Sequence, residues 1–271
     1  MSMIILEKAR PHVSVITLNR PERLHAMSAE LVSAFCETLK EVGADNDCWV
    51  AVLTGAGRGF CSGLDLEDRG VIPGVEGLTI PRVAMRAMAH YSKVVPAMRA
   101  IPQPIIAAIN GSAYGGGLCM SLGADIRIAS RSAVFNASGI VNGLTSTELG
   151  ASYLLPRLIG AAHSSDLLLT GREVDATEAE RMGLVSRVVP DGKALQHALE
   201  IAAKMCRYSP HGLAMTKEVI WANLEISNLD AAIQIENRNQ ILLGSTGNLD
   251  EFLAARREKR EPHYDDELRA V

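Results

Sequence analysis

Residues 104–117 read PIIAAINGSAYGGG and join an apolar strand to a glycine triplet. The run Ile105–Ile109 is short, apolar and uncharged, which is typical of a strand that is buried on both faces of a sheet. The triplet Gly115–Gly117 then opens an apolar helix that we expect to end near Gly123. The first N–H groups of a helix have no partner within it and carry a partial positive charge, so this opening can stabilise a negative charge.

A second stretch of similar design, LTGAGRGFCSGLDL, occupies residues 53–66. It begins in the apolar run Trp49–Thr54, which predicts another buried strand, and it continues with the cluster Gly55–Gly59. Glycine tolerates positive φ angles and lets a ligand approach the backbone closely. Two N–H groups from separate loops that point to one place would form an oxyanion hole. The alternative is that both glycine clusters are only tight turns in a packed core, and the residues alone leave both interpretations open.

Strand and helix patterns alternate through the first two thirds of the chain, and helices follow. This order predicts an α/β core with a helical C-terminal extension. We therefore divide the chain into residues 1–200, an α/β core, and residues 201–271, a helical region. One helix is marked by Ser28, which is suited to the N-cap, and by an apolar face that ends at Gly43. Another helix is expected before Pro102, with an apolar face at Met88, Tyr91, Val95 and Met98 and a polar face that runs from Arg82 to Arg99. Further helices are expected at about 147–158, 163–170, 175–182, 192–206, 210–222, 228–243 and 248–258.

The composition argues against several classes of protein. The 271 residues are 48% hydrophobic and 21% charged and carry a formal net charge of −4, which does not fit a nucleic-acid-binding surface or a disordered chain. The five cysteines form no C-x-x-C pair, so a reducing compartment is favoured over a disulfide framework or a zinc knuckle. No uncharged run of about 18 apolar residues is present. We therefore expect a cytoplasmic protein without a membrane span and without a nucleic-acid partner.

Common catalytic motifs are absent as well. The Gly55–Gly59 cluster lacks the third glycine and the distant acidic residue of a dinucleotide fingerprint, and there is no P-loop, H-E-x-x-H or G-x-S-x-G motif. The sequence therefore gives no support to nucleotide hydrolysis, zinc hydrolysis or α/β-hydrolase chemistry, and it predicts no metal ligand.

Several motifs, taken in order, resemble the crotonase superfamily of enoyl-CoA hydratases and isomerases. The resemblance covers about residues 4–260, and its main motifs are the two glycine-containing stretches quoted above. The shorter motifs are Asn19–Glu22 (NRPE), Ala124–Ala129 (ADIRIA), Leu154–Gly160 (LLPRLIG), Leu169–Arg172 (LTGR) and the spaced residues Ala176, Ala179 and Gly183–Val185.

This resemblance implies a spiral of ββα units, a helical C-terminal region that trimerises, and acyl-CoA thioester substrates. The expected partners are the acyl-CoA and further copies of the chain, in a homotrimer or in a hexamer built as a dimer of trimers. Coenzyme A is part of the substrate, so no separate cofactor is expected. The resemblance assigns an oxyanion hole to the backbone N–H groups of Leu64 and Gly116. It assigns further contacts with the substrate or with coenzyme A to Arg23, Leu24, Cys61, Ser62, Gly63, Asp65, Gly115 and Gly139.

Hydratases of this family carry two glutamates, and this sequence has neither. One would stand two residues after the glycine triplet, where this chain has Cys119, and the other would close a Phe-x-x-x-Glu stretch, where Gly139 follows Phe135. Adding water to a double bond needs one group to activate the water and one to deliver a proton, and neither residue is suited to this. We expect Cys119 to be a buried structural thiol, because it lies in an apolar helix without a neighbouring histidine.

Glu148 is the carboxylate that remains in a suitable place. It lies eight residues before Pro156, the distance at which some isomerases of the superfamily carry an acid. We expect it at the start of the next helix, where its alternative role is only to favour the helix N-terminus. His25 stands in the loop that the family uses for the adenine end of coenzyme A, and we expect it to be a surface histidine.

The sequence thus predicts an acyl-CoA enzyme of fatty-acid metabolism. In this interpretation Glu148 moves a proton between C2 and C4 of an enolate that the N–H groups of Leu64 and Gly116 stabilise. Two alternatives stay open. One is an enoyl-CoA hydratase whose acid and base occupy unrecognised positions, and the other is an acyl-CoA-binding protein without catalytic activity.

Overall fold

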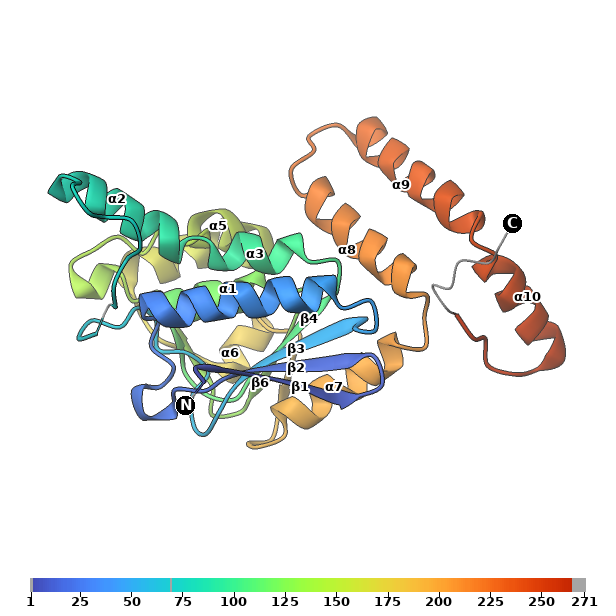
Figure 1. Cartoon of the computed structure of the whole chain (residues 1–271), viewed down its shortest axis with the longest axis horizontal. Coiled ribbons are helices and arrows are strands. Elements are labelled where there is room, and N and C mark those ends of the chain that lie inside the picture. The colour runs from blue at the N-terminus through green and yellow to red at the C-terminus, as the bar shows by residue number, and fades with distance from the viewer. Residues whose placement is uncertain (1, 69, 265–271) are drawn as a thin grey trace.

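The computed structural model describes residues 2–68 and 70–264, and a sheet covered by helices forms its core (Figure 1). The strands are β1 (Ile4–Arg10), β2 (Val13–Leu18), β3 (Val50–Gly55), β4 (Ile105–Ile109), β5 (Ala113–Tyr114), β6 (Ile126–Ser130), β7 (Val134–Asn136), β8 (Val174–Asp175) and β9 (Arg187–Val189). The described residues form a six-stranded sheet in the order β1-β2-β3-β4-β6-β9, in which β1 and β2 are antiparallel and the other neighbours are parallel.

Helices alternate with these strands and then make up most of the rest of the chain, so the predicted α/β class with a helical C-terminal region is confirmed. The α-helices are α1 (Ala29–Ala44), α2 (Ile80–Tyr91), α3 (Val94–Ala100), α4 (Gly116–Gly123), α5 (Ala151–Thr170), α6 (Ala176–Arg181), α7 (Ala194–Met205), α8 (Pro210–Asn223), α9 (Leu229–Gly244) and α10 (Asn248–Glu258). The described residues also form the short 3-10 helices η1 (Pro21–Arg23) and η2 (Ile140–Asn142).

The two faces of the larger sheet pack on different helices, because successive side chains of a strand point to opposite faces. Leu53 lies on the face covered by α1, α3 and α4, whereas Val52 lies on the face covered by α7 (Figure 1). The helix α7 presents Ala194, Ala198 and Ala202 to the sheet at a spacing of four residues, as a buried helix face requires. Burial on both faces explains the unbroken apolar runs of β3 and β4.

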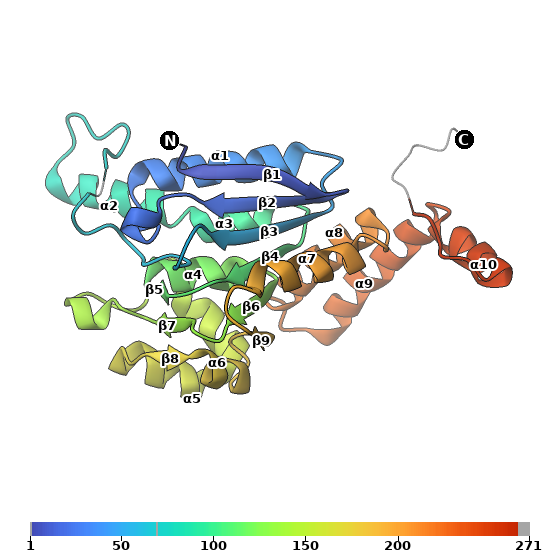
Figure 2. The same cartoon turned by 90° about the horizontal axis from the view of Figure 1, so that it is seen from below.

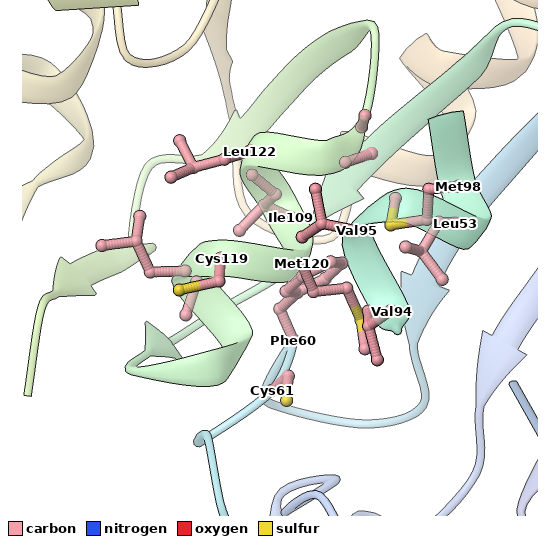
Figure 3. Close-up of a cluster of buried hydrophobic side chains, with 14 of the residues drawn as sticks. Leu53, Phe60, Cys61, Val94, Val95, Met98, Ile109, Cys119, Met120 and Leu122 are labelled. Atoms are coloured by element: carbon pink, nitrogen blue, oxygen red, sulfur yellow. The ribbon is translucent and has the colours of Figure 1, made fainter. Parts of the chain in front are cut away.

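A smaller sheet in the order β5-β7-β8 lies beside the larger one, on the side of α5 and α6 (Figure 2). The helix α4 connects the two regions, since it follows β5 directly and is buried along its whole length. Its side chains pack with Met98 of α3 and with Phe60 (Figure 3). Cys119 lies in this buried cluster, as expected for a structural thiol.

Several predicted helix boundaries differ from the structure. The one helix expected between Arg82 and Arg99 is two helices, α2 and α3, that are separated at Ser92 and Lys93. The two helices expected at 147–158 and 163–170 are confirmed as the two parts of α5, because the backbone between them is non-helical at Gly160, with a φ of +76°; the first part starts later than expected, at Ala151. The Ser28 N-cap is confirmed, since its hydroxyl accepts a hydrogen bond from the N–H of Leu31.

The last three helices extend away from the core (Figures 1 and 2). The helix α8 is joined to the core by Lys217, whose buried ammonium group donates to the backbone oxygens of Met98 and Gln103, both at 2.9 Å. Trp221, one turn further along α8, donates to the carboxylate of Asp125. Beyond α8 no residue of α9 is buried. None of the described helices is long and apolar enough to cross a membrane.

Candidate active site

A cavity of about 580 Å³ brings together residues from distant parts of the chain. Leu64 follows β3, Gly116 opens α4 and Glu148 precedes α5, so the three residues predicted to be catalytic line one cavity. Met27, which precedes α1, forms a parallel bridge with Leu64 and also lines the cavity. The other lining residues are Met88, Tyr91, Gly143, Leu144, Thr145, Thr147 and Leu149.

The glycine triplet is required because α4 begins directly against the loop that follows β3. A Cβ atom on Gly117 would overlap the carbonyl oxygen of Cys61. Gly63 has a φ of +90°, and a Cβ atom there would lie 2.7 Å from the oxygen of Tyr114 and 3.3 Å from the nitrogen of Gly116. The Tyr114 N–H also donates to the oxygen of Cys61 at 3.0 Å. Small residues in both motifs therefore let two segments of main chain meet.

The backbone N–H groups of Leu64 and Gly116 are left without a partner among the described residues. Gly116 is the first residue of α4, so its N–H has no acceptor within the helix. Met27 donates to the oxygen of Gly63 at 2.7 Å and accepts from the N–H of Asp65 at 3.1 Å. In such a parallel pairing the intervening Leu64 N–H points away from Met27. Two free donors thus lie on loops that pack against each other.

Glu148 lies on a left-handed turn and not at the start of a helix. Leu149 and Gly150 have φ angles of +45° and +93°, and α5 begins only at Ala151. The expected helix-start position of Glu148 is therefore wrong, because left-handed residues do not continue into a right-handed helix. A left-handed leucine costs on the order of 1–3 kcal/mol, and strain of this kind is frequent at functional sites.

The turn directs the Glu148 carboxylate toward the glycine triplet. Its Oε1 atom lies 3.3 Å from the position that a Cβ atom on Gly115 would occupy. No described residue donates a hydrogen bond to the carboxylate or pairs with it. Burial raises the pKa of Glu148 above its ordinary value. A half-buried carboxylate with a raised pKa in a cavity is suited to act as a general base.

Cys119 contacts the backbone of Glu148, but its thiol is not a substitute for a glutamate. Its thiol donates to the backbone oxygen of Glu148 at 3.5 Å and is buried. Burial, with a contribution from the nearby charge of Glu148, strongly raises the pKa of Cys119. The group therefore stays a neutral thiol at physiological pH and holds the turn that carries Glu148.

Gly139, at the other hydratase position, lies at the start of η2 and packs against a neighbouring segment of chain. A Cβ atom there would overlap the backbone oxygen of Thr145 and would lie 2.9 Å from the Cα of Ser146. This position therefore has no room for a side chain. Gly139 is not among the described residues that line the cavity.

The residues that the resemblance links to coenzyme A surround the cavity without lining it. Arg23 and Asp65 form an ion pair of 2.9 Å, and the hydroxyl of Ser62 donates to the oxygen of Arg23 at 3.4 Å. Of the described residues that line the cavity, none belongs to the set Arg23, Leu24, Cys61, Ser62, Gly63, Asp65 and Gly115. These residues shape the two loops that present the free N–H groups, and their contacts with a substrate stay predictions.

His25 is fully buried, so the expectation of a surface histidine is wrong. The N–H of Arg20 donates to its Nδ1 at 3.0 Å, and its Nε2 lies 2.8 Å from the oxygen of Ala56. Nδ1 is therefore the acceptor and Nε2 carries the proton, which defines a neutral ring. Burial lowers the pKa of His25 and keeps it neutral. The His25 ring joins the backbone of Arg20 to that of Ala56. The polar residues next to it in the sequence gave no sign of this role.

The first glycine cluster, Gly55–Gly59, is a tight turn and contributes no described residue to the cavity lining. A Cβ atom on Gly55 would overlap the backbone oxygen of Gly59. The structure therefore agrees with a tight turn at this cluster. The donor proposed on this side of the cavity is Leu64, five residues further along the chain.

The fold is that of the crotonase-like enzymes, a class that acts on acyl-CoA thioesters. Residues 8–267 match the sequence profile of the family described as "Enoyl-CoA hydratase/isomerase". The chain belongs to this family and is an enzyme of acyl-CoA metabolism. Among the described residues no group of three or more His, Cys, Asp or Glu side chains could hold a metal ion.

Relatives carry the names of both kinds of enzyme. A Mycobacterium tuberculosis protein named "Probable enoyl-CoA hydratase EchA12" is 48% identical over 98% of this chain and 94% of its own length. The "1,2-epoxyphenylacetyl-CoA isomerase" of Escherichia coli is 35% identical over 97% of this chain and 99% of its own. A crystal structure of a "probable enoyl-CoA hydratase/isomerase" from Mycobacterium abscessus has a TM-score of 0.94 and 44% identity, covering 99% of this chain and 100% of that one.

Proposed function

We propose that this enzyme moves a proton along the acyl chain of an enoyl-CoA thioester, as an isomerase does. One observation carries the proposal: the unpaired Glu148 carboxylate lies beside Gly115, in the cavity that Leu64 and Gly116 also line. Glu148 is the carboxylate among the described lining residues, and the two positions where hydratases carry glutamates hold Cys119 and Gly139. The site therefore offers a base and oxyanion donors without a second carboxylate to activate water.

The proposed reaction uses these groups in sequence. The N–H groups of Leu64 and Gly116 donate to the thioester oxygen, which makes the proton on C2 more acidic. The Glu148 carboxylate takes that proton, the C2–H bond breaks, and its electron pair moves into an enolate that is conjugated with the C3–C4 double bond. Glu148 then returns the proton to C4. The double bond moves from C3–C4 to C2–C3, and no atom is gained or lost.

The decisive experiment measures proton exchange and isomerisation in deuterated water with purified protein. We expect deuterium to enter a 3-enoyl-CoA at C2 and C4 as the 2-enoyl product forms, and we expect both to stop in a Glu148→Gln variant. Formation of a 3-hydroxyacyl-CoA instead would support the hydratase alternative. Binding of the acyl-CoA with neither exchange nor product would support the alternative of a binding protein without catalytic activity.

The acyl chain is proposed to leave the cavity between α2 and η2. Tyr91 and Met88, three residues apart on α2, line the cavity, and Met85 continues the same helix outward with 74% of its surface exposed. On the opposite side Leu144 lines the cavity and Val141 of η2 is exposed next to it. The two helices lie at the same end of the molecule in both views (Figures 1 and 2). Apolar side chains on both sides of an opening suit an alkyl chain.

A homotrimer, or a hexamer formed from two trimers, is proposed for the assembly. Large apolar side chains are exposed along the C-terminal helices, and a single copy of the chain leaves them in contact with water. They include Ile220, Leu224, Leu229, Ile233, Ile241, Leu242, Leu249, Phe252 and Leu253. The proposed division of labour is a core with the acyl-CoA site, residues 1–200, and an oligomerisation region, residues 201–271. Light scattering at micromolar concentration tests the proposed trimer or hexamer, and a monomeric mass would contradict both. The cytoplasmic location stays a prediction.

A further inference from the structure

The carboxylate of Asp65 is buried, with 2% of its side chain exposed, yet it does not line the cavity. It accepts four hydrogen bonds. The guanidinium groups of Arg20 and Arg23 donate at 2.6 and 2.9 Å, and the backbone N–H groups of Glu67 and Asp68 donate at 3.1 and 2.9 Å. Burial alone would raise the pKa of Asp65, but these donors hold it well below its usual range, so the group is ionised at neutral pH.

These contacts join the two segments that meet at Leu64. Arg20 bridges them, because the same Nη1 atom that donates to Asp65 also donates to the backbone oxygen of Ala26 at 3.0 Å. One residue further along, Met27 exchanges backbone hydrogen bonds with Gly63 and Asp65. The direction of the Leu64 N–H is thus set by hydrogen bonds on both sides of it.

We propose that Asp65 is a positioning residue, whose charge holds the Leu64 N–H in the direction needed to bind the thioester oxygen. This inference rests on the proposed oxyanion hole. The negative charge matters because all four groups around the carboxylate are donors. An asparagine in the same place has only one acceptor oxygen, and its amide hydrogens would face donor groups. A loss of this kind in a buried site shifts the backbone that the carboxylate holds.

The same arginines also make exposed ion pairs, which provide matched controls. Arg20 contacts Asp68 at 3.1 Å and Arg23 contacts Glu67 at 2.5 Å, and these two acidic side chains are 65% and 79% exposed. Exposed ion pairs contribute little, typically about 0–1 kcal/mol. The variants Asp68→Asn and Glu67→Gln remove a charge from the same network but leave the carboxylate of Asp65 in place.

The first test compares Asp65→Asn with these two controls. We expect Asp65→Asn to lower kcat for proton transfer on the order of 10–100-fold, less than the 10²–10³-fold that removal of a whole hole donor costs. Affinity for free coenzyme A, which has no thioester carbonyl, should change by no more than about threefold, and the controls should keep about the wild-type kcat. An unchanged kcat, or equal losses of kcat and of coenzyme A affinity, would overturn the proposal.

The second test measures how the oxyanion hole polarises a bound thioester carbonyl, in the absence of turnover. Infrared spectra of an acyl-CoA labelled with ¹³C at the thioester carbonyl report how strongly the bound carbonyl is polarised. We expect the wild type to shift this band to lower frequency, and Asp65→Asn to lose most of that shift. An absent shift in the wild type would contradict the proposed hole itself, whereas an unchanged shift in Asp65→Asn would contradict only the role of Asp65. If Asp65→Asn does not fold, Arg20→Lys keeps the positive charge but lacks the planar pair of nitrogens with which Arg20 contacts Ala26, Asp65 and Asp68 together, and the same loss of shift is expected.

Discussion

The two sides of the cavity are built in different ways. On the side of Leu64 and Gly116, the proposed catalytic groups are main-chain atoms, and glycines and a buried carboxylate fix them in place. On the side of Glu148, the proposed base is one side chain on a turn whose neighbours Leu144, Thr145 and Thr147 are exposed. The difference teaches that the proposed thioester contacts depend on the packing of the core, while the proposed acid–base group lies beside exposed residues.

The backbone side is tested most directly at Gly116, where we expect the largest effect. Gly116→Pro removes the proposed donor without breaking a helix hydrogen bond, because proline is tolerated at the first position of a helix. Loss of one hole donor costs about 10²–10³ in kcat, and the altered backbone should add to this until turnover is undetectable.

Gly116→Ala is the matched control, because it adds the same Cβ atom beside the flexible end of Met27 but keeps the N–H. We expect it to keep most of the activity. Rates for both variants are measured with folded protein, as judged by circular dichroism. Equal activity of the proline variant and the wild type would show that the Gly116 N–H is not a donor to the substrate.

The Glu148 side of the cavity is tested by Glu148→Gln, which keeps the shape of the side chain and removes the proposed base. Turnover should fall by a factor on the order of 10²–10⁴, the usual range for a lost general base, while acyl-CoA affinity changes little. Since Glu148 must be ionised to act, wild-type kcat should fall as the pH is lowered through its raised pKa. A pH profile with no such limb, or a fully active glutamine variant, would place the base elsewhere.

The outer end of the cavity should show a smaller and substrate-dependent effect. Met85→Asp places a charge on the proposed path of the acyl chain and should lower kcat/KM by about tenfold for a C12 enoyl-CoA. A C4 enoyl-CoA is too short to reach Met85 and should be unaffected. Met85→Leu, which stays apolar, should behave as the wild type with both substrates. Equal losses with both chain lengths would argue against this path.

The smallest effect concerns stability, and its sign follows from the raised pKa of Glu148. Between its unfolded and folded pKa values the folded protein binds the extra proton, so stability decreases as the pH rises through this window. At neutral pH the ionised carboxylate is then a cost to the folded state. Glu148→Gln should have a higher urea midpoint than the wild type at pH 7, and the difference should disappear near pH 4. A lower midpoint at pH 7 would mean that the carboxylate has a stabilising partner.

The sequence indicated the close approach of the two main-chain segments better than it indicated the position of Glu148. The glycine triplet is required sterically, since no other residue fits at Gly117 beside the backbone oxygen of Cys61. A requirement for glycine can be seen directly in the sequence. The position of Glu148 was less accessible, because Thr145, Ser146 and Thr147 resemble helix caps. In the structure the Ser146 hydroxyl instead donates to the oxygen of Ala137 and accepts from the N–H of Ile140.

Two other features depended on contacts between segments that are distant in the sequence. The burial of His25 follows from its bond to Ala56, 31 residues away, and local polarity gave no sign of it. The apolar pattern that predicted one helix between Arg82 and Arg99 continues through the break at Ser92, because Tyr91 of α2 and Val95 and Met98 of α3 are buried in the same core cluster. A periodic pattern identifies the buried face but does not register an interruption between two helices that share it.

The tight packing at Gly139 restricts where a second carboxylate could be added to this site. A glutamate there would need a Cβ atom where the backbone oxygen of Thr145 already lies, so a single codon change would give a distorted loop instead of a new catalytic acid. Adding a carboxylate at this position requires the chain around η2 to be rebuilt first, by insertion, deletion or several coordinated substitutions. In evolutionary terms the close packing blocks a one-step gain of a carboxylate at this position. Directed evolution of water addition in this scaffold should therefore begin with libraries that vary the length of the loop at residues 139–147.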